Sequence, residues 1–181
     1  MASLGHVAVG MAMARGYLPK DAPTSTLAKT MAVFGAVSML PDADVVAFSL
    51  GIPYSHPWGH RGATHSICFA LILGAALWLV LKRARDVPRV RTTVFVTLLL
   101  VTHGLLDALT DGGLGAELLW PFTTRRYFFE PFNHIPVAPI GLGMFSAIGI
   151  RVVLTELLIF SPFWLYALLP RAWLSRVKKP G

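Results

Sequence analysis

The chain has 181 residues, of which 55% are hydrophobic and 14% are charged, and its mean hydropathy is +0.62. Soluble domains carry about a quarter charged residues, so the composition argues against a soluble enzyme and indicates a membrane protein. The net charge of +7 raises nucleic-acid binding as an alternative, which depends on where the basic residues lie. The single cysteine, Cys68, excludes an internal disulfide and any CxxC zinc or redox site.

Two short apolar segments come first, at residues 4–17 and 27–40. The first is apolar apart from His6 and Arg15, and the second ends where Pro41 follows. At 14 residues each, they fall short of the roughly 20 residues that a helix needs to cross a bilayer. We expect short helices packed inside a bundle. The first segment lacks the basic start of a secretory signal, so we interpret it as mature protein.

Three longer segments predict membrane spans. Residues 62–81 carry no charge, residues 92–110 are apolar in their first half, and residues 140–169 are long enough to cross with a tilt. Pro162 predicts a kink in the last of these. Neither an internal repeat nor a long linker is visible. The sequence therefore predicts a single all-α domain over residues 1–181, a polytopic membrane bundle of about five helices with three clear spans and two short N-terminal helices.

The basic residues predict how the bundle is oriented. Cytoplasmic loops carry an excess of lysine and arginine, and in the five-helix arrangement 12 of the 16 basic residues fall on one side. These are Arg15, Lys20, Lys29, Lys82, Arg83, Arg85, Arg89, Arg91, Arg171, Arg176, Lys178 and Lys179. This arrangement predicts a cytoplasmic C-terminus and places the 41–61 and 111–139 loops outside. Nucleic-acid binding thereby loses its main support, whereas the lipid bilayer is the expected partner.

Histidines and aspartates gather on the opposite, outer side of the predicted bundle. Ionisable groups at membrane depth are costly and mark candidate functional sites. His103 and Asp107 are four residues apart and so share one helical face. Five separate segments bring such residues to one level, and the seven candidate metal ligands are His6, Asp42, Asp44, His60, His65, His103 and Asp107.

Imidazole and carboxylate groups suit a divalent metal, zinc first and manganese or iron as alternatives. A catalytic zinc takes three protein ligands and keeps a water, so seven groups exceed what one ion needs. Two ions, or one ion with outer residues that orient its ligands, both fit this number. For Asp42 and Asp44, we expect one to bind the metal and the other to cap a helix or handle protons.

The segment from His60 to Ser66 also predicts an anion site. Thr64 can cap the following apolar helix, whose N-terminus favours a negative charge. Arg61 can hold a phosphate through two parallel hydrogen bonds. The sequence thus predicts a catalytic role for Arg61 as a phosphate clamp.

Several strings together resemble one family. These are His6 after Gly5, Leu40-Pro-Asp-Ala-Asp44, His60-Arg-Gly-Ala-Thr-His-Ser66, His103 to Asp107 with Leu109-Thr110 after it, and Leu119-Trp-Pro121. They resemble the YdjM-like membrane-bound metal-dependent hydrolases. The resemblance implies a bacterial or archaeal inner membrane protein with a metal-dependent hydrolase activity, distantly similar to zinc-dependent phospholipase C proteins. Asp111 is carried over only as an extra ligand outside the family pattern.

The sequence therefore predicts a membrane metal-dependent hydrolase that cleaves a phosphoester of a lipid or another amphiphile with a metal-activated water. Arg61 would hold the phosphate, and Asp44 would handle the proton. The alternative is a transporter of metal ions or protons that uses the same histidines and aspartates. A histidine-nucleophile phosphatase is disfavoured, because no basic residue lies between Arg91 and His103.

Other polar and aromatic residues have simpler interpretations. His56 and His134 lie in proline-rich loops and are expected at the surface. Arg151 and Glu156 are expected to form a structural pair, with each other or with other helices. The aromatic residues between 120 and 132 are expected to form a belt at the membrane interface.

Overall fold

The computed structural model describes residues 3–139 and 141–170, and helices make up its regular structure. The α-helices are α1 (Ser3–Tyr17), α2 (Thr24–Ser38), α3 (Val46–Ser49), α4 (Ile67–Val80), α5 (Arg89–Asp107), α6 (Ala147–Ile159) and α7 (Ser161–Leu168). Short 3₁₀ helices are η1 (Pro41–Val45), η2 (Ala63–His65), η3 (Leu81–Arg83) and η4 (Gly141–Phe145). Within the described residues, β pairing is limited to two isolated bridges. The predicted all-α class is confirmed.

Helix α1 lies at the centre of the bundle, in contact with α2, α5, α6 and α7. Ala8 and Ala14 on this helix are fully buried. Gly10 lets α1 approach α2 closely, because a Cβ there would lie 2.7 Å from the carbonyl oxygen of Phe34. The expectation of a short helix packed inside the bundle is therefore met for α1.

The sequence predicted three clear membrane spans, and the structure supports one of them as a single unbroken helix. Only α5 among the described helices is long and apolar enough to cross a membrane unbroken. The segment predicted at 62–81 is shorter than expected, because residues 63–65 form η2 and the 14-residue α4 begins only at Ile67. Two further crossings would each need a bent pair of helices, α2 with residues 41–49 or α6 with α7.

The last predicted span breaks where Pro162 predicted a kink. Helix α6 ends at Ile159, α7 begins at Ser161, and the two helices meet at 63°. Pro162 lies in the first turn of α7, where a missing backbone N–H leaves no helical hydrogen bond unmade. Position 140, where this segment was expected to begin, lies outside the described residues.

The distribution of side chains is the reverse of that in a soluble domain. Large apolar side chains are exposed on the outer helices, including Leu71 and Leu79 on α4 and Ile148 and Leu158 on α6. Charged and polar side chains are buried instead, and the buried set includes three histidines and two acids that are at most 2% exposed: His6, His65, His103, Asp107 and Glu156. Apolar surface facing outward and polar groups facing inward suit a lipid environment.

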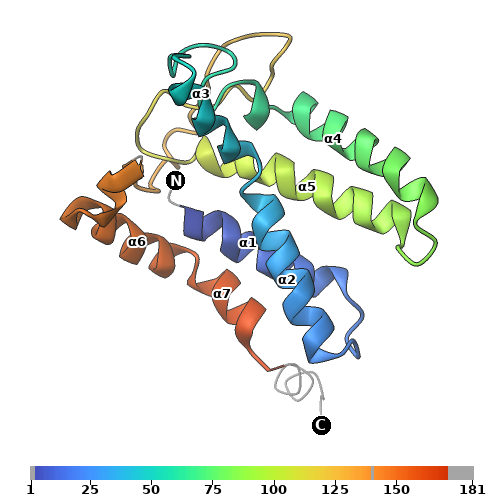
Figure 1. Cartoon of the computed structure of the whole chain (residues 1–181). Helices are drawn as coiled ribbons and strands as arrows, with labels where there is room; N and C mark the ends of the chain where they lie inside the picture. The colour runs from blue at the N-terminus through green and yellow to red at the C-terminus, as the bar shows by residue number, and fades with distance from the viewer. Residues whose placement is uncertain (1–2, 140, 171–181) are drawn as a thin grey trace.

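The bundle has two chemically different ends. The start of α1, the short helix α3 and the long loops lie at one end, whereas the α4–α5 connection and the end of α7 lie at the other (Figure 1). Asp42 and Asp44 lie in η1, which directly precedes α3 at the first end, and Lys82 and Arg83 lie in η3, which begins the α4–α5 connection at the second. These positions are compatible with the predicted separation of the basic residues from the histidines and aspartates. Which end faces the cytoplasm stays a prediction, and the basic residues from 171 to 179 lie outside the described residues.

Two buried polar groups tie α1 to the last two helices. Glu156 on α6 accepts a hydrogen bond from the backbone N–H of Gly5 (3.1 Å). Arg15 donates to the carbonyls of Ala167 (2.8 Å) and Leu169 (2.6 Å) at the end of α7. Arg151 is exposed, so Glu156 serves as a structural contact to another helix, the second of the two arrangements expected.

Candidate metal centre

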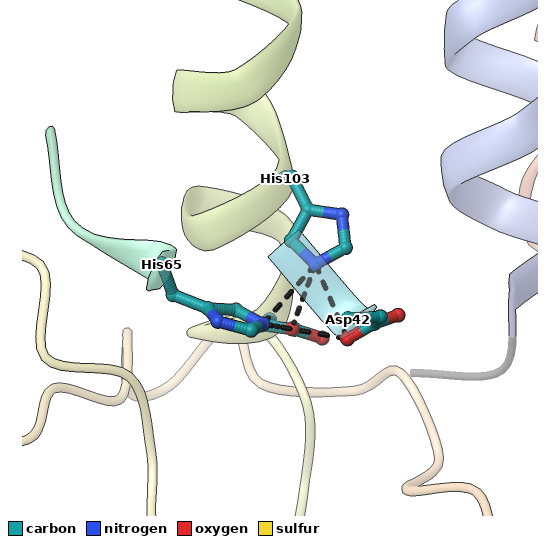
Figure 2. Close-up of side chains that lie close together, drawn as sticks. Asp42, His65 and His103 are labelled. Atoms are coloured by element: carbon teal, nitrogen blue, oxygen red, sulfur yellow. Dashed lines mark hydrogen bonds and ion pairs between the residues drawn. The ribbon is translucent and has the colours of Figure 1, made fainter. Parts of the chain in front are cut away.

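Four side chains from three separate elements converge on one point. Asp42 comes from η1, His65 ends η2, and His103 and Asp107 lie on one face of the last turns of α5. Figure 2 shows the rings of His65 and His103 directed toward Asp42. The Nε2 atoms of the two histidines are 3.1 Å apart. Each residue offers one ligand atom, and all four atoms lie within 4.8 Å of one another.

The spacing of these atoms matches the coordination shell of one small cation. His65 Nε2 lies 3.4 Å from Asp42 Oδ1 and 3.0 Å from Asp107 Oδ2, and His103 Nε2 lies 3.4 and 3.5 Å from the same two oxygens. Zinc binds nitrogen and oxygen at about 2.0–2.2 Å, so the edges of its tetrahedron measure roughly 3.3–3.6 Å. The observed spacing is close to those edges.

Hydrogen bonds at the far side of each imidazole ring fix which nitrogen faces the centre. Nδ1 of His103 lies 2.7 Å from the carbonyl oxygen of Ser38, which can only accept, so this nitrogen carries the proton. Nδ1 of His65 lies 3.2 Å from Asp44 Oδ2. In the neutral rings, both Nε2 lone pairs then point inward at each other, an arrangement that a cation between them stabilises.

The acids around His65 also favour its protonated form. Burial opposes the charge, but hydrogen bonds to Asp107, Asp42 and Asp44 outweigh it and raise the pKa of His65 well above its usual value. A proton and a metal ion therefore compete for the same ring nitrogen. The concentrated negative charge is the electrostatic feature that attracts either cation.

Asp44 is the hydrogen-bond centre behind the ligands. One carboxylate oxygen pairs with His60 Nδ1 (2.7 Å), and the other accepts from the Thr64 hydroxyl (2.6 Å) and the Arg61 backbone N–H (3.2 Å). Asp44, His60 and His65 form a second group whose ligand atoms lie within 4.8 Å of one another. The sequence expected Thr64 to cap the apolar helix. That was wrong, because Ser66 caps α4 by accepting from the N–H of Phe69 (3.0 Å).

His6 stands next to the four-residue group without belonging to it. Its ring stacks on that of His103 with centroids 3.7 Å apart. Its Nε2 lies 3.6 Å from Asp107 Oδ1, and neither ring nitrogen has a hydrogen-bond partner among the described residues. The side chain is 1% exposed. A buried imidazole beside a carboxylate, with no hydrogen-bond partner at either nitrogen, has the chemistry of a metal ligand, and the ligand role of His6 stays a prediction.

Arg61 reaches the centre from behind Asp107. Its Nη2 lies 3.2 Å from Asp107 Oδ1, and its Nη1 donates to the Thr110 hydroxyl (2.8 Å). The residue has a φ of +61°, a left-handed backbone conformation that is uncommon outside glycine and is found at functional sites. The guanidinium thus pairs with the carboxylate of a candidate ligand. The sequence predicted instead that it holds a phosphate, and that role stays a prediction.

A pocket of about 540 Å³ opens beside the centre. Asp42, His60, Arg61 and Tyr54 contribute polar groups to its wall. The side chain of Asp42 is 18% exposed, whereas those of His65, His103 and Asp107 are at most 1% exposed. An ion held by these four residues would therefore be reached from the pocket, on the side of Asp42.

Comparison with known proteins agrees with this architecture. The profile of the YdjM inner membrane protein family matches residues 1–176. The chain belongs to this family. An inner membrane protein of Escherichia coli (strain K12), YbcI, is 36% identical to it over 154 residues, which cover 84% of this chain and 86% of that protein. No solved structure matches. The family resemblance seen in the sequence is confirmed, and both descriptions support a location in the inner membrane.

In this YdjM-family chain, the remaining sequence candidates lie away from the centre. Asp111 is exposed and accepts a hydrogen bond from the N–H of Val137 (2.8 Å), so it organises a loop and lies outside the ligand groups. His56 and His134 are exposed, as expected. Phe122 and Phe132 in the aromatic segment are 87% and 70% exposed, which is compatible with the expected interfacial belt.

Sequence reasoning missed several groups on which the YdjM-family site depends. The Ser38 carbonyl is backbone, so no side-chain pattern reports it. Glu117 pairs with Arg126 (3.1 Å), and Arg126 also donates to the carbonyls of Tyr54 (2.9 Å) and His60 (3.1 Å), which ties the loop before η2 in place. Burial raises the pKa of Glu117, although Arg126 beside it opposes this. The available signal for this ion pair was the presence of two opposite charges, Glu117 and Arg126, in loops that are otherwise rich in aromatic residues.

Proposed function

We propose that this YdjM-family protein is a metal-dependent hydrolase with one divalent ion held by Asp42, His65, His103 and Asp107. The observation that carries the proposal is the near-tetrahedral spacing of four ligand atoms, with both imidazole rings anchored at Nδ1. The mixed nitrogen and oxygen set suits zinc, with manganese or iron as alternatives. Such an ion, when bound, acts as a Lewis acid and lowers the pKa of a coordinated water.

The surrounding residues supply the remaining functions. Asp44 keeps the proton on Nδ1 of His65 and so keeps Nε2 directed at the ion. It also holds Nδ1 of His60, which leaves Nε2 of that pocket-lining ring to accept a proton. The sequence predicted that Asp44 itself would handle the proton in the reaction. We instead infer that His60 carries the proton and Asp44 positions the ring.

One ion is favoured over two. Both ligand groups need His65, and the four groups that surround the carboxylate of Asp44 already occupy it: the rings of His60 and His65, the hydroxyl of Thr64 and the backbone of Arg61. A second ion at Asp44 would displace these contacts and release the His65 ring. His6 remains an additional ligand for the same ion.

The reaction we propose is hydrolysis of a phosphoester in a lipid or another amphiphile. An ion at Asp42 and the guanidinium of Arg61 would place two positive centres at one wall of the pocket, which suits a phosphate anion better than a neutral amide. The inner membrane supplies amphiphiles directly. A phosphate would compete with Asp107 for the Arg61 guanidinium, so we infer that Arg61 shares its donors between the two.

We further propose that the site faces the outer side of the membrane and that the C-terminal side of α7 faces the cytoplasm, in a multi-pass arrangement. The basic residues at the α4–α5 connection support this orientation. A reporter fused to the C-terminus should be active only in its cytoplasmic form. A periplasmic signal from that fusion would reverse the orientation.

The hydrolase proposal is tested on purified protein in lipid nanodiscs, by metal analysis and by hydrolysis of bis(4-nitrophenyl) phosphate. We expect about one zinc or manganese ion per chain and metal-dependent release of nitrophenol. His65→Ala and Asp107→Asn should lose both bound metal and activity. His134→Ala is the matched control, because it removes an exposed histidine far from the ligand groups.

Two results would contradict the proposal. Metal-free protein with full activity in both ligand variants would exclude metal-dependent hydrolysis. Metal flux into sealed liposomes without hydrolysis of any phosphoester would instead favour the transporter alternative.

A further inference from the structure

The pocket beside the metal centre has two unlike walls. One wall carries Asp42, His60 and Arg61. The remaining lining is largely apolar and comes from the end of α2, from η1, from the loop before η4 and from η4 itself, with Met39, Val45, Val137 and Met144 among its side chains. Met39 lies one helical turn before the ligand Asp42, so the apolar wall begins next to the point where chemistry would occur.

The apolar wall does not end at the pocket. Gly141 and Met144 line the pocket from η4, and the same short helix carries Leu142 and Phe145, which are 85% and 82% exposed. Ile148, at the beginning of the next helix, is 68% exposed. Exposed apolar side chains therefore follow the pocket lining along η4 to the start of α6. A small hydrophilic substrate would make no use of these side chains.

We propose that the pocket binds an amphiphilic phosphoester with its phosphate between an ion held at Asp42 and the guanidinium of Arg61, and with its hydrocarbon chain along Met39, Val45, Val137 and Met144. This inference rests on the proposed hydrolase function and names the substrate class and the residues that select it. A pocket of about 540 Å³ lies within the range of small-ligand sites. It accommodates a headgroup and the first part of a chain, and the rest of the chain follows η4 into the bilayer.

The chain-binding wall predicts a steep dependence on chain length. Each methylene that leaves water for an apolar surface strengthens binding about threefold to fourfold. Affinity should rise with each carbon while the chain lies within the pocket and level off once it reaches the bilayer. Free inorganic phosphate offers the same anion without the chain, so it separates recognition of the anion from recognition of the amphiphile.

The experiment measures binding by titration calorimetry of protein in nanodiscs, with empty nanodiscs as the reference for partitioning. The probes are inorganic phosphate and ethyl, butyl, hexyl and octyl phosphate, each with zinc-loaded protein. We expect hexyl phosphate to bind at least tenfold more tightly than ethyl phosphate. Met144→Gln should weaken hexyl phosphate about tenfold and leave ethyl phosphate unchanged.

Leu71→Gln is the control variant, since it places the same polar group on an exposed position of α4, outside the pocket lining and away from η4 and α6. It should leave the chain-length dependence intact. Equal affinity for ethyl and hexyl phosphate would overturn the inference, as would a loss of the chain-length dependence in Leu71→Gln but not in Met144→Gln.

A second measurement separates this inference from the hydrolase proposal. Hydrolysis of ethyl and hexyl 4-nitrophenyl phosphate with the same KM would overturn the chain-binding wall and leave the hydrolase in place. Chain-dependent binding with no hydrolysis of either diester by the zinc-, manganese- or iron-loaded protein would overturn the hydrolase and, with it, the substrate assignment.

Discussion

The two ends of helix α1 bury polar side chains for different purposes. Near its C-terminal end, the Arg15 guanidinium donates to two backbone carbonyls that close α7. Near its N-terminal end, His6 stacks on His103 beside Asp107, and its ring nitrogens have no hydrogen-bond partner among the described residues. Burial alone therefore does not identify a site. A buried polar group indicates a binding function where acids and imidazoles converge with ligand atoms left over, and a structural function where backbone groups satisfy it.

The sharpest test of this contrast compares two glycines at close contacts. A Cβ on Gly104 would lie 2.2 Å from the backbone oxygen of His65, and a Cβ on Gly74 would lie 2.1 Å from the Thr97 hydroxyl. The first neighbour is backbone and must move, whereas the second is a rotatable side chain. Gly104→Ala should displace His65 from His103 and weaken metal binding by roughly a hundredfold, the same order as the loss of rate that a misplacement of about 1 Å causes at catalytic sites.

Gly74→Ala should lower the melting temperature and leave metal affinity within about twofold. Both affinities are measured by competition with a chromophoric chelator. Unchanged affinity in Gly104→Ala would contradict the placement of η2 against α5.

The next largest effect is expected from the residue behind the ligands. Asp44→Asn replaces the carboxylate that faces Nδ1 of His65 with an uncharged amide of similar size. Outer residues of this kind typically contribute ten- to a hundredfold to metal affinity, and we expect a loss in that range with the same competition assay. Asp111→Asn is the matched control, because that carboxylate accepts from the N–H of Val137 and belongs to neither ligand group. Equal losses in the two variants would refute the positioning role of Asp44.

The structural end of α1 should respond in stability alone. Arg15→Leu removes two charge-assisted hydrogen bonds to the carbonyls of Ala167 and Leu169. We expect a loss of about 3 kcal/mol in the free energy of unfolding, because such bonds contribute about 1.5–3 kcal/mol each and the leucine recovers part of the packing. Metal content should match wild type. A variant that loses metal while remaining folded would break the proposed division between the two ends.

The smallest expected effect is the pH dependence set by Glu117. Burial raises the pKa of this carboxyl in the folded protein, so its contribution to stability is complete below the unfolded value of about 4.3 and is lost as pH rises through the folded value. Part of the fall in melting temperature above pH 4 should therefore come from Glu117. Glu117→Gln should remove that part, so its melting temperature should fall less steeply with pH. Scans from pH 4 to pH 7 on both proteins measure the difference. Parallel curves would contradict the burial argument.

Much of the fold could be predicted from the sequence where the signal is local. Low charge and long apolar runs indicated a membrane helical protein, and the segments at 4–17, 27–40 and 92–110 correspond to α1, α2 and α5. Pro162 marked the break between α6 and α7. The run at 62–81 misled, because apolarity does not show where a helix begins. Ser66 caps α4 after a 3₁₀ turn that brings His65 to the centre.

The site was predictable as a set of residues but not as an assignment of their functions. The i, i+4 spacing of His103 and Asp107 correctly predicts a shared face, because helix geometry is local. The separation of Asp42 as a ligand from Asp44 as the acceptor behind His65 depends on how η1 packs against η2. Two residues apart in one short 3₁₀ helix, they point in different directions, and no sequence pattern orders them.

The sequence by itself indicated a membrane environment and a helical class, and it predicted which residues make up the candidate centre. These follow from composition, hydropathy and helical period, which are properties of neighbouring residues. Only the tertiary structure decided which nitrogen of each histidine faces inward, that Arg61 pairs with Asp107, and that Met39, Val45, Val137 and Met144 line one pocket with Asp42. Those features depend on contacts between segments far apart in the chain, and packing alone sets their distances.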